Sequence, residues 1–162
     1  MQVTPLSIEH FELAASWLGR PEINRWLTSD WRGKDVTSTA IGIMLRNKRN
    51  RIFVVLEDGP PCGLVGLADM DQIDQVAMIW YLLGEPGLGG KGLITRAVAD
   101  VSRLGFETMG LRNIYAWIME DNEPSRKVLE RAGFQVSGRL RSATVSDGRQ
   151  VDRIYYDLTR DG

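Results

Sequence analysis

A glycine-rich segment is the part of this sequence whose residue types and spacing point most directly to chemistry. Glycine occupies four of the six positions from 87 to 92, with one lysine among them: Gly87, Gly89, Gly90, Lys91 and Gly92. Backbone without Cβ atoms can curl so that successive N–H groups point outward. A helix beginning here adds its own unpaired first N–H groups and the positive end of its dipole. The segment therefore predicts a phosphate-binding site.

The elements on either side of this segment must position it. The apolar run from Val76 to Leu83 is rich in aromatic and β-branched residues and predicts a largely buried strand. An amphipathic helix follows from Lys91 to about Met109, and Arg112 to Met119 predicts the next strand. A strand, helix, strand unit joins parallel neighbours. The glycine segment is thus expected at the C-terminal edge of a parallel pair.

The rest of the chain predicts an antiparallel setting for that pair. Strands are expected at 2–6, 51–57 and 62–68 before it, and a closing hairpin at 134–145 and 150–159 after it. Further helices are expected at 7–18, 36–48 and 123–132, while 22–34 reads as an irregular helix or loop. The predicted fold class is α/β (α+β): a mixed, mostly antiparallel sheet with one parallel pair and about four helices.

Composition limits the possible classes of protein. A chain of 162 residues with 43% hydrophobic and 25% charged residues fits a single globular domain spanning 1–162. A net charge of −1 gives no electrostatic footprint for nucleic acid or an anionic membrane. No apolar run approaches the ~20 residues of a spanning helix, and the first residues do not form a signal sequence. We therefore expect a cytoplasmic protein.

Two residue types are nearly absent, and this narrows the chemistry. Cys62 is the only cysteine, so neither an intramolecular disulfide nor a zinc cluster can form. His10 is the only histidine, which excludes His-based metal sites and Ser-His or Cys-His catalysis within one chain. No metal is expected.

Two common phosphate motifs fit the glycine segment poorly. Gly87-x-Gly89-x-x-Gly92 matches the dinucleotide fingerprint, with Glu120 as the ribose acid, but that fold needs further βα units on each side. A P-loop would need glycine where Glu85 stands and Ser or Thr where Gly92 stands.

A third pattern carries a resemblance. The antiparallel strands, the glycine segment, and a helix that opens on Asn122-Glu123-Pro124-Ser125 and ends at Ala132-Gly133-Phe134 resemble the acetyl-CoA-binding core of the GNAT superfamily of N-acetyltransferases. Thr4-Pro5-Leu6 and the Gly148-Arg149, Asp152, Tyr156 ending suit the RimJ/RimL-like branch of ribosomal-protein N-terminal, amino-sugar and antibiotic-modifying enzymes. The likeness covers nearly the whole chain. One departure is Gly87, where the family has Gln or Arg.

The resemblance implies acetyl-CoA as cosubstrate. Its pyrophosphate would lie on the N–H groups of Leu88 to Leu93, and its pantetheine arm beside the strand at 81–83, where the parallel strands splay apart. Ser125 would lie near the thioester sulfur, although helix capping alone also explains Asn122 and Ser125. The implied cofactor-binding residues are Tyr81, Leu82, Leu83, Leu88, Gly89, Gly90, Lys91, Gly92, Leu93, Asn122 and Ser125.

Acetyl transfer to an amine needs a neutral nitrogen, donors for the carbonyl oxygen and a thiolate that can leave. An α-amine of pKa ~8 needs less help from a base than a lysine-like amine at ~10.4. A backbone N–H near Leu82 would serve as the oxyanion donor. The family's tyrosine acid and a related carboxylate are replaced by Leu129 and Trp117.

Other groups must therefore move the protons. The candidate catalytic residues are Ser125, Glu120, Asp69 and Tyr81, with Asp71 and Glu85 as further acids near strand ends. Trp26, Trp31 and Trp117 are expected to wall the acceptor pocket, the first two because their segment is too irregular to need them as core, whereas Trp17 and Trp80 are assigned to the core.

The sequence thus predicts an acetyl-CoA-dependent N-acetyltransferase that works by direct attack in a ternary complex. The acceptor amine would belong to a protein N-terminus, an amino sugar or a small amine. The alternatives are transfer of another acyl group, an amino-sugar nucleotide enzyme, and a catalytically inactive CoA-binding sensor or scaffold. The resemblance to the family also leads us to expect a homodimer.

Overall fold

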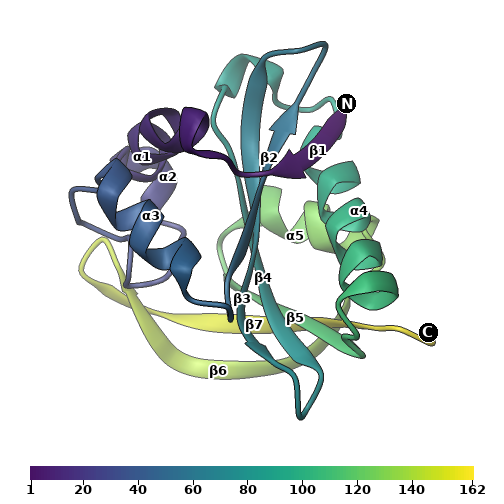
Figure 1. Ribbon diagram of the computed structural model, residues 1–162. Helices are drawn as coiled ribbons and strands as arrows, with labels where there is room; N and C mark the ends of the chain where they lie inside the picture. Colours follow the sequence, from purple (N-terminus) through teal and green to yellow (C-terminus); the bar gives the residue numbers. More distant parts are fainter.

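The computed structural model describes residues 1–162 and contains one seven-stranded sheet with helices on both faces (Figure 1). The sheet order is β1-β2-β3-β4-β5-β7-β6, and every neighbouring pair is antiparallel except β4 and β5. The predicted mixed sheet with one parallel pair is confirmed. The strands are β1 Gln2–Pro5, β2 Arg51–Leu56, β3 Pro61–Asp71, β4 Val76–Leu83, β5 Asn113–Met119, β6 Gln135–Ser146 and β7 Arg149–Thr159.

The helices divide between the two faces of the sheet. Three lie on one face, α1 (Phe11–Leu18), α2 (Pro21–Asn24) and α3 (Ser38–Arg46), and two on the other, α4 (Leu93–Thr108) and α5 (Glu123–Arg131) (Figure 1). Short 3-10 turns cover Ile8–His10 and Pro86–Leu88. The structure has one helix more than the four expected. This helix, α2, is a single turn inside the segment that was expected to be irregular. None of the helices combines the length and apolar character needed to cross a bilayer.

Each face of the sheet has its own core. On the α4 side, Leu93, Ala97 and Val101 recur at helical spacing and are buried against the sheet. On the α1 side, Trp17, Leu18 and other apolar residues pack against side chains of β2, β3 and β4. Because β4 alternates its side chains between these cores, it is buried on both faces.

The parallel pair is short. β4 and β5 are paired only over Val76 to Met78, opposite Asn113 to Tyr115, and the strands diverge beyond those three positions. The predicted splaying is therefore present. The sheet has a gap at the C-terminal ends of its two central strands, next to the N-terminus of α4.

Gly84 follows β4 at a point where there is no room for a side chain. A Cβ there would lie 2.1 Å from the ring of Trp17, which is fully buried. We expect Gly84→Ala to lower the free energy of unfolding by about 1–3 kcal/mol, because a buried indole must shift. Chemical denaturation measures this change. Gly138→Ala is the matched control, since a Cβ at Gly138 meets no atom within 4 Å, and equal stability of the two variants would contradict the expectation.

Candidate active site

A cavity of about 700 Å³ passes from one face of the sheet to the other at the gap between β4 and β5. Its lining includes residues of α4 and α5 on one face and residues of the α2 and α3 region on the other. Both cores contribute to its wall, for example Ile79 from the α4 side and Leu82 from the α1 side. Two molecules entering from opposite faces would therefore meet in the gap.

The glycine segment forms one end of this cavity. Gly90 and Gly92 have φ values of +79° and +70°, which L side chains adopt only with strain, and both line the cavity. The backbone N–H groups of residues 90 to 95 donate no hydrogen bond within the chain. Such a row of free donors at the start of a 16-residue helix fits a phosphate group. Lys91 is exposed and lies outside the lining.

The inner edge of β4 offers further free donors. The N–H of Gly84 donates to the carbonyl of Cys62 on β3 at 2.8 Å. Because N–H groups alternate in direction along a strand, the N–H of Leu82 also faces β3, whereas those of Tyr81 and Leu83 face the gap. A donor for a carbonyl oxygen in the gap is therefore Tyr81 or Leu83 and not Leu82, whose side chain lines the α1 side of the cavity.

Tyr81 and Ser125 join the two sides of the gap. The Tyr81 hydroxyl lies 2.7 Å from Ser125 Oγ and 3.2 Å from the Ser125 carbonyl. Burial raises the pKa of Tyr81 far above its ordinary value, partly offset by the hydrogen bond to Ser125. Tyr81 is therefore a neutral phenol at neutral pH and cannot act as a base, but it can hold the Ser125 hydroxyl in place.

Asn122 caps α5 and keeps one group free. Its Oδ1 accepts a hydrogen bond from the Ser125 N–H at 3.3 Å, whereas its Nδ2 has no partner in the chain. Asn122 also lines the cavity. Capping thus leaves the amide nitrogen available to a molecule in the gap.

Asp69 lies at an irregularity in β3 on the opposite face. The register against β4 shifts between Ala68 and Asp71, and Asp69 has a φ of +52°. Arg49 stabilises this backbone, since its guanidinium donates to the carbonyls of Met70 at 3.3 Å and Asp69 at 3.5 Å. Asp69 lines the cavity, but the other candidate acids Asp71 and Glu85 do not. The Asp71 carboxylate accepts two N–H groups of its own turn, and the Glu85 carboxylate accepts from Trp17 Nε1 at 3.3 Å.

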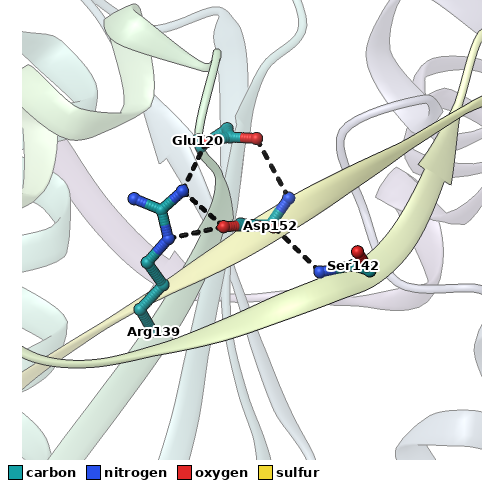
Figure 2. A network of polar contacts seen from close by, with 4 residues as sticks. All are labelled: Glu120, Arg139, Ser142 and Asp152. Atoms are coloured by element: carbon teal, nitrogen blue, oxygen red, sulfur yellow. Dashed lines mark hydrogen bonds and ion pairs between the residues drawn. The ribbon is translucent and has the colours of Figure 1, made fainter.

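Glu120 is not part of the cavity wall. Its carboxylate accepts the Asp152 N–H at 3.2 Å and pairs with Arg139 at 3.1 Å (Figure 2). Arg139 also pairs with Asp152, which accepts the Ser142 N–H at 2.8 Å. This network joins the end of β5 to β6 and β7. Glu120, a candidate catalytic residue from the sequence, thus lies outside the cavity lining, because nearness to a strand end does not set the direction of a side chain.

The network should make stability depend on pH. The hydrogen bond from Ser142 and the Arg139 guanidinium hold the pKa of Asp152 below its ordinary value. A lowered carboxyl pKa stabilises the folded state above the ordinary pKa, and this contribution is lost as the pH falls through the folded pKa. We expect Asp152→Asn to lower the melting temperature at pH 7, and this deficit to shrink as the pH falls below the ordinary carboxyl pKa of ~3.9. Asp35→Asn, at an exposed site, is the control, and a deficit that persists at low pH would contradict this account.

Four tryptophans line the cavity: Trp26, Trp31, Trp80 and Trp117. Trp31 is only 7% exposed and belongs to the α1-side core, 6.3 Å from Trp80. The expectation that its segment needs no core residue was therefore wrong, although Trp31 reaches the cavity as well. The ring of Trp117 carries the Arg153 guanidinium on one face at 3.9 Å.

Sequence reasoning missed three features of the cavity. Glu22, Asp30 and the end of α3 line it. None of them was predicted, because neither the irregular segment nor the end of α3 contains a recognisable binding motif. The basic cluster was attributed to the helix dipole alone, but Arg49 has the specific role described above. No group of three or more His, Cys, Asp or Glu side chains is placed to hold a metal ion.

The structure thus combines a short, splayed parallel pair, a helix start with free N–H groups and a cavity lined from both faces of the sheet. The family model described as Acetyltransferase (GNAT) domain matches residues 1–135. The chain belongs to the GNAT acetyltransferase family, whose members use acetyl-CoA.

Individual relatives agree with this membership. The chain is 34% identical over 106 residues to a Bacillus subtilis protein named "Putative ribosomal N-acetyltransferase YdaF", over 65% of this chain and 57% of that one. It is 31% identical over 110 residues to spermidine N(1)-acetyltransferase of Escherichia coli K12, over 68% of this chain and 59% of that one. The chain thus spans less than two thirds of the length of these two relatives.

A solved structure shows the same fold. The spermidine N-acetyltransferase from Vibrio cholerae, in complex with CoA and spermine, superposes with a TM-score of 0.87 at 17% identity, over 99% of this chain and 95% of that one.

Proposed function

We propose that this protein is an acetyl-CoA-dependent N-acetyltransferase that moves the acetyl group to a primary amine by direct attack, with both substrates bound together. The observation that carries the proposal is the cavity that traverses the β4–β5 gap and ends at the free N–H groups of residues 90 to 95. Acetyl-CoA supplies an activated acetyl thioester at that gap. Each remaining requirement falls to the chain's own residues.

The α4 side fits the donor. The N–H groups of residues 90 to 95 would bind the pyrophosphate, with Lys127 and Arg131 of α5 adding positive charge from the cavity wall. The inner edge of β4 at Tyr81 and Leu83 would pair with the amides of the pantetheine arm, and Asn122 Nδ2 would donate to it. These residues would fix the position of the sulfur.

Stabilisation of the leaving thiolate on the donor side would fall to Ser125. A thiol of pKa ~8.5 leaves without strong assistance, so a hydroxyl hydrogen bond to the sulfur suffices. Tyr81 would accept from or donate to Ser125 Oγ at 2.7 Å and so fix the direction of that hydroxyl. The Tyr81 or Leu83 N–H would stabilise charge on the carbonyl oxygen.

The acceptor side offers Asp69 as the base. Among the acids considered from the sequence, Asp69 alone lines the cavity. The raised pKa of Tyr81 removes the phenol as an alternative base. Asp69 would take a proton from the bound ammonium, directly or through one water, and the neutral amine would then attack the thioester carbonyl.

The acceptor is proposed to be a protein N-terminus or a small amine, in line with a RimJ/RimL-like branch. The ribosomal designation of YdaF favours the former and the spermidine relative the latter. An amino-sugar nucleotide remains an alternative within the same reaction.

A CoA-binding sensor is the second candidate function, because a buried Leu129 and Trp117 stand where many family members have an acid and a carboxylate. Measuring CoA affinity and then thiol release with a panel of amines separates the two. We expect both binding and turnover. Binding with no thiol release from any amine would favour the sensor, and no binding would reject both.

A further inference from the structure

A second cavity, of about 380 Å³, lies outside the candidate active site and shares no residue with it. It lies between α4, the end of α5 and the end of β7, and the two helices cover the same face of the sheet (Figure 1). A Cβ at Gly133, just after α5, would be 3.7 Å from Leu158 of β7, so the strand runs close to the end of that helix. The lining residues are Ala99, Ser102, Arg103, Phe106, Glu107, Ala132, Leu158 and Arg160.

Ser102 brings a polar group to this cavity that the chain leaves unpaired. The residue is only 1% exposed, and its Oγ has no hydrogen-bond partner. A hydroxyl in a helix can bond the carbonyl four residues earlier, as Thr108 of the same helix does with Leu104 at 2.7 Å. Ser102 makes no such bond. Because an unpaired buried hydroxyl costs free energy, it points to a molecule that supplies the missing partner.

The apolar walls of the cavity are only partly covered. Phe106, Ala132 and Leu158 pack against the α4-side core, yet each keeps part of its surface exposed. An apolar body in the cavity would remove that surface from water, which is favourable. The walls therefore favour a ligand with an apolar part.

The charged side chains of the lining are all exposed, and positive charge predominates among them. Arg103 and Arg160 are opposed by Glu107 alone. Arg103 pairs with Asp100 at 2.7 Å, whereas Arg160 forms no ion pair. The Arg160 backbone is fixed, since its N–H donates to the Arg112 carbonyl at 3.0 Å. A guanidinium without an internal partner is well suited to bind a carboxylate.

We propose that this cavity is a second ligand-binding site, for a small carboxylic acid with an apolar body. The apolar body would lie against Phe106 and Leu158. The Ser102 hydroxyl would donate to a carboxylate oxygen, and the Arg160 guanidinium would supply the opposite charge. Because the two cavities are separate, this site does not depend on the proposed acetyltransferase function.

The test compares phenylacetate with phenylacetamide, which have nearly the same shape and differ in charge. Phenylacetate should move the NMR amide signals of residues 99–107 and 158–160 in isotopically labelled protein. A ligand of this size is expected to bind with a dissociation constant on the order of 1 mM. Phenylacetamide should bind more weakly. Saturating CoA should leave phenylacetate binding unchanged, whereas it would displace a carboxylate from the N–H groups of residues 90 to 95.

Replacing Ser102 separates binding from stability. Ser102→Ala should weaken phenylacetate binding about tenfold, because a hydrogen bond to a charged group is lost. The same variant should not lower the melting temperature of the unliganded protein, since the hydroxyl has no partner to lose and alanine favours a helix.

Charge variants give signed expectations. Arg160→Gln should weaken phenylacetate binding by up to about fivefold, and Glu107→Gln should strengthen it by a similar factor. Arg96→Gln is the matched control, because it removes an exposed guanidinium of α4 that lines neither cavity. Its affinity for phenylacetate should equal that of the parent protein.

Several results would overturn the proposal. Signals that do not saturate, or that shift at residues 90 to 95 and not at 99–107, would show that phenylacetate does not occupy this cavity. Equal affinities for phenylacetate and phenylacetamide would show that the charge is not recognised. A Ser102→Ala variant that binds phenylacetate as tightly as the parent protein, or that melts at a lower temperature, would show that the hydroxyl is not kept for a ligand.

Discussion

Gly90→Val should raise the dissociation constant for CoA about tenfold to thirtyfold. At a φ of +79° a non-glycine residue is strained by about 1–2 kcal/mol, and a β-branched side chain lies at the upper end of that range. The variant can relieve the strain only by turning the backbone, which redirects the N–H groups of residues 90 to 95. Binding must then restore the strained conformation, and the affinity falls by that cost.

Titration calorimetry with CoA measures this effect, and Gly87→Ala is the matched control. Gly87 lies in the same segment, its φ is not positive, a Cβ there meets no atom within 4 Å, and it does not line the cavity. Its affinity for CoA should be unchanged. If Gly90→Val binds CoA as tightly as the parent protein, the glycine segment is not the pyrophosphate site.

Asp69→Asn should lower kcat/KM for an aliphatic amine about 100-fold at pH 7, the range expected for loss of a general base. The amide keeps the size of the side chain but cannot accept the ammonium proton. The deficit should shrink as the pH approaches ~10.4, where the acceptor is already neutral. It should also be smaller for an α-amine of pKa ~8, which is partly neutral at pH 7. Thiol release followed across pH measures both trends.

Asp74→Asn is the control for this experiment. Asp74 is exposed in the turn between β3 and β4, close in sequence to Asp69 but outside the cavity lining. A deficit in Asp69→Asn that stays constant across pH would show that this residue positions the acceptor and is not the base.

Most of the fold follows from local patterns in the sequence. Apolar spacing places α4 within two residues of its observed start, and Gly133 marks the end of α5. The turn at Asp147 and Gly148 sets the closing hairpin, where both residues have positive φ. These features depend on nearby residues, so one sequence suffices to predict them.

The site is only partly predictable, because its walls come from segments distant in sequence. The glycine segment and Asn122 carry recognisable signals, but Glu22 and Asp30 reach the cavity only because the segment after α1 folds across the sheet. The direction of the Leu82 N–H follows from pairing with β3, and the displacement of Glu120 follows from its contact with Asp152. Such facts require the tertiary arrangement. The irregularity at Asp69 could not be predicted either, because a positive φ is expected at glycine and residue 69 is an aspartate.

The short β4–β5 pairing should also affect local opening of the sheet. Only three residue pairs join the four N-terminal strands to the three C-terminal ones within the sheet, so this seam carries little backbone hydrogen bonding of its own. Amide hydrogens along the inner edge of β4 should exchange with deuterium far faster than those facing β3. A ligand that bridges β4 and β5 should slow this exchange, as an added strand would. The melting temperature of the whole chain should then rise with ligand concentration.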